Sequence, residues 1–279
     1  MPFSAPSLLA GGAARADLLT YDFCTGTGSH TTGASTTFLP DPAVGGGSDR
    51  VRIGTTGGSF DLVNPGDALG TDTELQGTAP TSTSVNKFSI YDIATPTPQF
   101  YASFKLKLTG GASGTWYMFM GDGTSYSDNN GFTGTQVVSG LRWTFGASGA
   151  ITENYRNAGA WSALPDSFSQ DTEYFVEVYA NNASTATTYA GGAQSLAAGR
   201  WDLWVNSSLV GDDLARAQQV ADTNIDSIMF YGESSTANVA KIILDDMTYS
   251  TTLAAVPEPA TAGLLGLGLL VARCFRTRR

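Results

Sequence analysis

The feature that most constrains this chain is an alternation of apolar and polar residues with a period of two, clearest over residues 99–108. One face of that segment would carry only apolar side chains, those of Phe100, Ala102, Phe104, Leu106 and Leu108. The other face would carry mostly polar ones. Because successive side chains of an extended strand point to opposite faces, this pattern predicts a half-buried β-strand.

Similar extended segments recur along the chain, and turn-rich stretches containing Gly, Asn and Asp separate them. The further predicted strands are Thr20–Cys24, Ser59–Val63, Phe88–Ile93, Trp116–Met120, Leu141–Phe145, Ile151–Tyr155, Tyr174–Tyr179, Trp201–Val205, Ser227–Tyr231 and Lys241–Tyr249. Only 14% of the residues are charged and 33 are glycine, which suits many short strands joined by turns. The segment 212–220 is predicted as one short helix. Strands without intervening helices favour antiparallel sheets packed as a sandwich.

The chain divides into a central body and two terminal segments. We predict one β-sandwich domain over residues 17–251, with no internal repeat and no linker that would split it. Residues 1–16 contain a short apolar stretch and the small-residue sequence Ala14–Arg15–Ala16. They are interpreted as a signal peptide shortened at its start, the alternative being a disordered tail. Residues 252–279 are interpreted as a sorting or anchor segment.

Charge and residue counts exclude several functions. The chain has 15 Lys and Arg against 25 Asp and Glu, a net charge of −10, so no basic surface is expected for nucleic acid. One histidine, His30, and two cysteines exclude a zinc site built from several His or Cys ligands. His30 is predicted to lie in a loop, and Cys24 is predicted to be a buried free thiol.

The C-terminus combines three unlike features in a fixed order. Val256–Pro257–Glu258–Pro259 precedes an apolar run over residues 260–272, which would span only about 20 Å as a helix. That is shorter than the ~30 Å hydrocarbon core of a bilayer. The apolar run and the basic tail after it include Leu264, Leu265, Leu267, Leu269, Leu270, Val271, Arg273, Arg276, Arg278 and Arg279. The arginines should hold this end in the cytoplasm, with the body outside.

This arrangement resembles the PEP-CTERM sorting signal of Gram-negative bacteria. The resemblance implies an exosortase, a membrane transpeptidase-like protease, as partner. It also implies a short transmembrane helix, an intermediate in the inner membrane, and delivery to the cell surface or extracellular matrix. The alternative is an amphipathic or buried C-terminal helix. Whether the tail is cleaved stays open.

In its strand order the body resembles the laminin-G/concanavalin A-like jelly roll, over roughly residues 88–250. The segments that carry the resemblance are the strand at 100–108, the hairpin at 141–155 and the closing strand with its Asp245–Asp246 step. The resemblance implies an all-β, antiparallel jelly-roll sandwich. In sugar-binding jelly rolls a closing-strand aspartate ligates structural calcium, so Asp246 and the first-strand Asp22 are candidate calcium ligands. The alternative for Asp246 is an exposed or hydrogen-bonded aspartate.

Candidate residues for chemistry are few. Glu173 and Glu177 would lie about 13 Å apart on one strand, too far for paired carboxylate catalysis, and both are predicted to face solvent. Trp161 and Tyr126 are predicted in exposed loops, where a ring face can stack on a sugar. The other tryptophans, Trp116, Trp143, Trp201 and Trp204, fall in predicted strands and are expected in the core.

The sequence therefore predicts an exported surface or matrix protein that is not an enzyme and whose jelly roll binds polysaccharide or another surface component. Fold analogy alone indicates that ligand class. Two alternatives stay open: an extracellular enzyme acting on glycans, and a purely structural protein of the biofilm matrix.

Overall fold

The computed structural model describes residues 18–24, 26–42, 48–63, 69, 72–81, 84–123, 132–165, 168–233 and 239–253. These residues form β-strands joined by turns, and their helical segments are single 3₁₀ turns at Gly134–Gln136, Ala147–Gly149 and Ala190–Gly192. None of these turns has the length or hydrophobicity to cross a membrane. The predicted transmembrane segment and the sorting motif lie outside the described residues.

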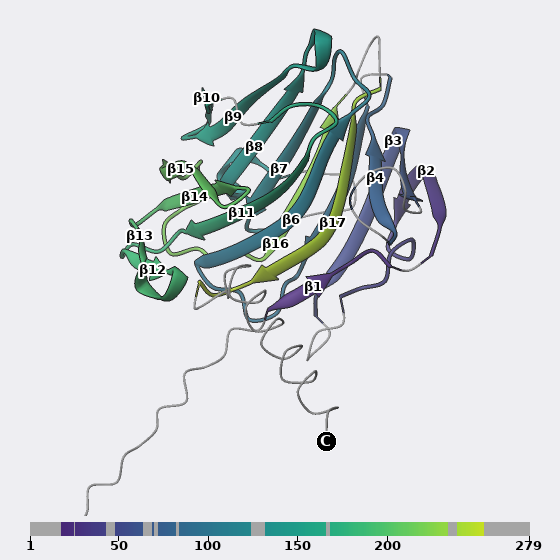
Figure 1. Cartoon of the computed structure of the whole chain (residues 1–279). Coiled ribbons are helices and arrows are strands. Elements are labelled where there is room, and N and C mark those ends of the chain that lie inside the picture. Colours follow the sequence, from purple (N-terminus) through teal and green to yellow (C-terminus); the bar gives the residue numbers. More distant parts are fainter. Residues whose placement is uncertain are drawn as a thin grey trace, which may run out of the picture.

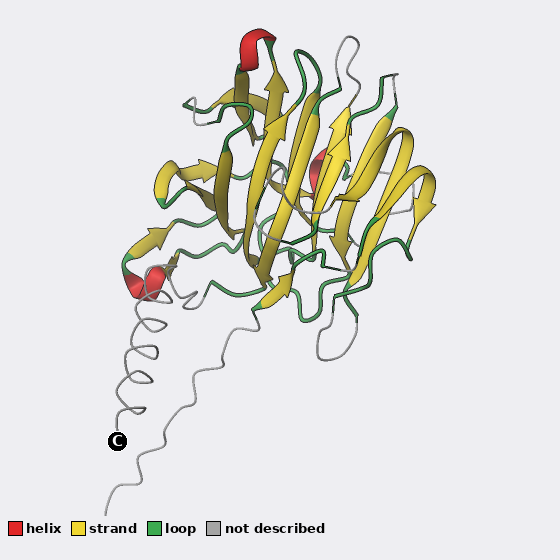
Figure 2. Ribbon diagram, turned by 45° about the vertical axis from the view of Figure 1, so that its right-hand side comes forward, coloured by secondary structure: helices red, strands yellow, loops and turns green. Residues whose placement is uncertain are grey.

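The strands form two packed layers joined by one long strand (Figures 1 and 2). The first layer runs, in spatial order, β10 (Ala160–Ala163), β9 (Ile151–Asn157), β8 (Val137–Phe145), β7 (Thr115–Gly121), β16 (Ser227–Glu233), β5 (Val85–Tyr91) and the first half of β3 (Arg50–Val63). The second continues with the rest of β3, β4 (Glu74–Thr78), β17 (Lys241–Ser250), β6 (Gln99–Thr109), β11 (Glu173–Asn181), β14 (Arg200–Val205) and β15 (Ser208–Ala215). β3 pairs with β5 over its first half and with β4 over its second.

Four short strands complete the body. β1 (Leu19–Tyr21) pairs with β17, and β2 (Gly28–Ser35) pairs with β3. β12 (Thr187–Tyr189) and β13 (Gln194–Leu196) form a separate hairpin. All the pairings between named strands are antiparallel, so the fold is the predicted all-β jelly-roll sandwich.

The core lies between the two layers, where the apolar faces of the strands meet. The predicted apolar face of β6 is buried, since Phe100, Ala102, Phe104, Leu106 and Leu108 are at most 1% exposed. Phe104 meets Phe230 of the first layer edge to face, with 5.1 Å between the ring centroids. Trp116, Trp143 and Trp201 are fully buried as predicted, whereas Trp204 is only half-buried.

The predicted short helix at 212–220 is wrong. Residues up to Ala215 belong to β15, which pairs antiparallel with β14. The turn between these strands has positive φ at both Asn206 and Ser207, 49° and 62°. Such a turn matches the twist of paired strands, so it directs the chain back as a hairpin before a helix can start.

Candidate functional site

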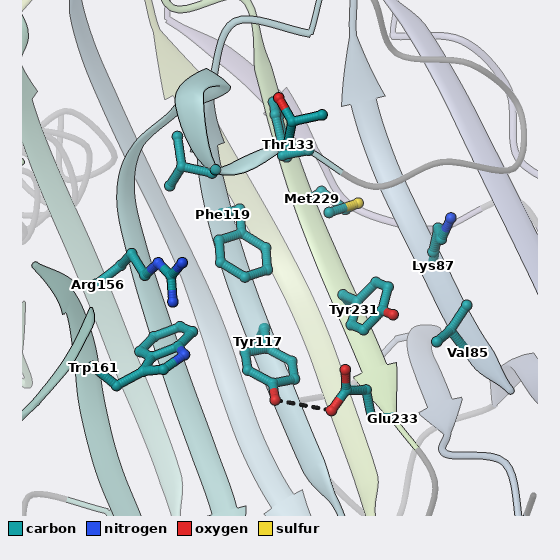
Figure 3. A pocket seen from close by; sticks show the side chains of 13 residues that line it. Val85, Lys87, Tyr117, Phe119, Thr133, Arg156, Trp161, Met229, Tyr231 and Glu233 are labelled. Atoms are coloured by element: carbon teal, nitrogen blue, oxygen red, sulfur yellow. Dashed lines mark hydrogen bonds between the residues drawn. The ribbon is translucent and has the colours of Figure 1, made fainter. Parts of the chain in front are cut away.

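A cavity of about 610 Å³ opens on the outer face of the first layer (Figure 3). Its walls come from β5, β7, β9, β10, β16 and the segment 132–137. The same alternation that builds the core places side chains here. On β7, Trp116 and Met118 point into the sandwich and are fully buried, whereas Tyr117 and Phe119 point out and are half-buried. On β16, Phe230 points inward and Tyr231 lines the cavity.

Four aromatic rings make one continuous surface in this cavity. The rings of Tyr117 and Phe119 stack with centroids 5.7 Å apart, and Tyr231 meets Tyr117 edge to face at 5.8 Å. Trp161 on β10 closes the surface, 5.5 Å from Tyr117 and 6.1 Å from Phe119. We refer to Tyr117, Phe119, Trp161 and Tyr231 as the aromatic platform. Flat, half-exposed rings of this kind can cover the apolar face of a ring-shaped ligand.

Cationic side chains surround the platform. The guanidinium carbons of Arg142 and Arg156 lie 4.7 and 5.2 Å from the ring centroid of Trp161, within cation–π range. Arg142 also donates hydrogen bonds from Nε and Nη2 to Oδ1 of Asn154, which fixes the plane of its guanidinium. Lys87 Nζ lies 6.0 Å from the ring centroid of Tyr231. Burial and the neighbouring charge of Arg52 lower the pKa of Lys87.

One carboxylate, Glu233, lies among the described residues that line the cavity. Its Oε2 accepts a hydrogen bond of 2.9 Å from the Tyr117 hydroxyl (Figure 3). Burial and the Glu233 carboxylate raise the pKa of Tyr117, so this hydroxyl stays protonated and acts as a donor at neutral pH.

The structure describes one of the two residues predicted to stack on a sugar. Trp161 lines the cavity, although it lies in the short strand β10 and not in a loop. Tyr126 lies outside the described residues. The other rings of the platform were missed, yet a signal for two of them existed. Since Trp116 and Met118 alternate with Tyr117 and Phe119, a strand that buries the first pair must turn the second pair outward.

The two candidate calcium ligands lie at neighbouring positions on paired strands. β1 pairs Tyr21 with Met247, and Asp22 and Asp246 come directly beyond that pair. Lys105 Nζ lies 2.7 Å from Asp246 Oδ2, so an ammonium group already neutralises this carboxylate. Calcium would have to displace that group. The described residues contain no cluster of three or more His, Cys, Asp or Glu side chains able to hold a metal.

Asp245, the other half of the acidic step, is the buried one. Its side chain is 1% exposed, and Lys105 Nζ lies 3.8 Å from its Oδ2. Burial, together with the charge of Asp246, raises the pKa of Asp245 to about 6. The folded protein therefore binds this proton more tightly than the unfolded chain does, and the carboxyl group costs stability as pH rises from about 4 through 6.

We expect Asp245→Asn to raise the melting temperature at pH 8, because the variant removes a buried charge. The gain should shrink or vanish near pH 4.5, where the wild-type carboxyl group is mostly protonated in the folded state. Thermal unfolding of both proteins at the two pH values measures this difference. A shift of equal size at both pH values would contradict the assignment.

Three further predictions about single residues are wrong. Glu177 does not face solvent: it is buried, and its Oε1 accepts hydrogen bonds from the hydroxyls of Tyr101 and Tyr179, beneath the β12–β13 hairpin. Glu173 on the same strand is exposed, as predicted. His30 lies in β2 because residues 28–35 pair with β3. Cys24 is exposed, since β1 ends at Tyr21.

Comparison of the fold with solved structures finds resemblances at low sequence identity. The cellulose induced protein Cip1 is 14% identical with a TM-score of 0.45, and the match covers 72% of this chain and 88% of Cip1. A structure of botulinum neurotoxin type C, whose cell entry depends on interaction with two ganglioside molecules, is 11% identical with a TM-score of 0.45. That match covers 84% of this chain and 48% of the toxin chain, so this chain spans about half its length.

Comparison of the sequence gives one match, confined to the C-terminus. No curated protein matches the chain. The PEP-CTERM protein-sorting motif matches residues 255–279, which include the predicted Val256–Pro257–Glu258–Pro259 step, apolar run and arginine tail. The chain therefore carries a PEP-CTERM sorting motif, which marks it as an exported protein that a membrane exosortase sorts to the cell surface.

Proposed function

We propose that this exported chain is a binding protein of the cell surface or matrix, and that its jelly roll binds polysaccharide in the cavity of the first layer. The aromatic platform carries the proposal. Its four rings lie side by side on the outer face of one sheet and are half-buried, so they offer ring faces to a ligand. Aromatic side chains with a polar edge suit ligands that have one apolar and one hydroxylated surface, as sugars do.

We also propose that the protein binds its ligand without cleaving it. Most glycoside hydrolases place two carboxylates on either side of the scissile bond, roughly 5–9.5 Å apart. Among the described lining residues the cavity offers Glu233 alone, and that side chain is hydrogen-bonded to Tyr117. Incubating a bound polysaccharide with the protein and measuring its chain length tests this directly. Shortened chains would favour the alternative of a glycan-active enzyme.

Replacement of Trp161 tests the binding proposal. We expect Trp161→Ala to weaken polysaccharide binding about tenfold or more, because truncation of a large aromatic contact residue typically costs over 1.4 kcal/mol. Trp161→Phe should retain a large part of the affinity. Phe175→Ala removes a half-buried ring from β11 in the second layer and serves as the matched control. Affinity electrophoresis of the purified proteins through gels containing a panel of polysaccharides measures retardation.

The outcomes separate the alternatives. Retardation lost in Trp161→Ala and kept in Phe175→Ala supports the cavity as the binding site. No retardation of the wild type by any polysaccharide would instead favour a structural matrix protein without a defined ligand.

The sequence predicts structural calcium at Asp22 and Asp246, whereas the Lys105 contact predicts none at Asp246, and melting experiments distinguish the two. We expect Asp246→Asn to lower the melting temperature by a similar small amount with calcium and with EDTA, because in both buffers Lys105 loses its 2.7 Å partner. A loss that occurs only with calcium would identify Asp246 as a ligand. Asp22→Asn, whose Oδ1 accepts a hydrogen bond from the backbone N–H of Cys24, should then behave in the same way.

A further inference from the structure

The cavity face has a charge opposite to that of the chain as a whole. The protein has a net charge of −10, yet four of its 15 Lys and Arg residues gather on this face. Arg156 and Lys87 line the cavity, Arg142 contacts Trp161, and Arg52 lies close enough to Lys87 to lower the pKa of that amine. Against these cations the described lining residues include one carboxylate, that of Glu233. A surface on which positive charge is concentrated attracts ligands of negative charge.

Strand register arranges these charges in a row with the tyrosines at its centre. Arg142 on β8 pairs with Tyr117 on β7, Tyr117 pairs with Tyr231 on β16, and Tyr231 pairs with Lys87 on β5. The row therefore runs across four adjacent strands as cation, ring, ring, cation. At about 4.8 Å between neighbouring strands, it spans roughly 14 Å. Arg156 pairs with Trp161 on β10 and extends the charged, aromatic surface beyond Arg142.

The two ends of the row suit carboxylate groups. A guanidinium offers five N–H donors in a planar fork that matches a carboxylate, and the contacts with Asn154 occupy two of the donors of Arg142. Its guanidinium carbon lies 4.7 Å from the centroid of the Trp161 ring, on which a sugar would lie. Lys87 supplies a point charge at the opposite end, next to the Tyr231 ring.

We propose that the ligand is a carboxylated polysaccharide of the uronate type, lying across the strands of the first layer. Sugar rings stack on Tyr117, Tyr231 and Trp161, and the carboxylates lie against Arg142, Arg156 and Lys87. This proposal rests on the proposed function and specifies its ligand class. The aromatic platform provides contact area, and the cations select acidic chains and offset the repulsion between the ligand and an acidic protein.

The test uses the full-length protein and three probes in affinity electrophoresis: polygalacturonate, neutral hydroxyethyl cellulose and dextran sulfate. We expect polygalacturonate to bind at least tenfold more tightly than the neutral polymer in about 50 mM salt. Its affinity should fall as the salt concentration rises, because salt screens the charged contacts. Arg142→Gln, Arg156→Gln and Lys87→Gln should each lower this affinity about five- to tenfold. Arg142→Lys keeps the positive charge but lacks the forked guanidinium. It should therefore lose less affinity for polygalacturonate than Arg142→Gln does.

A matched control distinguishes the effect of charge at the cavity from the effect of the net charge of the protein. Arg200→Gln changes the net charge of the protein by the same amount at an exposed position of β14 in the second layer, and it should stay within twofold of wild type. Melting temperatures close to that of the wild type show that each variant is folded.

The results distinguish a wrong ligand class from a wrong binding site. Equal affinity for the neutral polymer, or an equal loss in Arg200→Gln, would overturn the acidic ligand while dependence on Trp161 still supported a sugar site. Equal or tighter binding of dextran sulfate would overturn the assignment to carboxylates. If no polymer binds and Trp161→Ala has no effect, the proposed function itself is wrong.

Discussion

Trp116→Ala is expected to lower the free energy of unfolding by about 3–5 kcal/mol, the largest stability loss that we predict for a single substitution. The indole is fully buried between the two layers, where it meets Phe60 of β3 with 6.2 Å between centroids. Its Nε1 donates a hydrogen bond of 3.1 Å to the carbonyl oxygen of Ala240. Truncation would leave a cavity in the core, while the Ala240 carbonyl would keep its hydrogen bond of 2.9 Å from the backbone N–H of Ala79. Since small domains are stable by about 5–15 kcal/mol in all, this loss is a large part of the total.

Two glycines pack closely against the indole ring of Trp116. A Cβ atom added to Gly77 on β4 or to Gly232 on β16 would lie 2.6 or 2.7 Å from atoms of the indole. We therefore expect Gly232→Ala to cost about 1–3 kcal/mol. Gly54→Ala on β3 is the matched control, because a Cβ there meets nothing within 4 Å. Urea unfolding followed by far-ultraviolet circular dichroism measures all three variants. Equal stability of Gly232→Ala and Gly54→Ala would contradict this packing.

Replacement of Pro257–Glu258–Pro259 by three alanines is expected to abolish delivery to the cell surface. The PEP-CTERM motif matches this segment, and the substitution removes the sequence that the exosortase reads. The apolar run and the arginine tail would remain, so we expect the protein to accumulate in the inner membrane with its body outside. Fractionation of producing cells, followed by mass spectrometry of the C-terminus, measures both location and cleavage.

The matched control for this experiment replaces the exposed Asp212 on β15 by alanine, which alters an acidic residue of the body and leaves the motif intact. That variant should reach the surface as the wild type does. If the triple-alanine variant also reaches the surface normally, the motif does not sort this protein.

Local patterns in the sequence predicted the fold well but the site only in part. The alternation over residues 99–108 identified β6 and its buried face, because burial on one side of a strand imposes a period of two. The same pattern cannot show which outward-facing side chains become neighbours. Tyr231 and Lys87 meet because β16 pairs with β5, a contact between segments far apart in the chain.

Local sequence patterns also cannot predict which single polar residues are buried. The alternation along β11 places Glu177 on the outer face of the sheet. It is buried only because the β12–β13 hairpin lies over that part of the sheet. The positive φ of Asp246, 46°, marks an irregularity in the pairing of β17 with β6 between Asp245 and Thr248. No feature of the acidic step itself indicates which of its two carboxylates is inside.

Hydroxyl-radical footprinting of the exported protein, with and without saturating polygalacturonate, measures whether a polysaccharide covers the aromatic platform. The ligand should reduce oxidation of Trp161, Tyr117 and Tyr231 several-fold, because it would cover the platform. Trp204, which is half-buried on the second layer, should be oxidised equally in both samples. Protection of Trp204 with the platform unprotected would contradict a polysaccharide site on the first layer, and no protection of either would contradict polygalacturonate as its ligand.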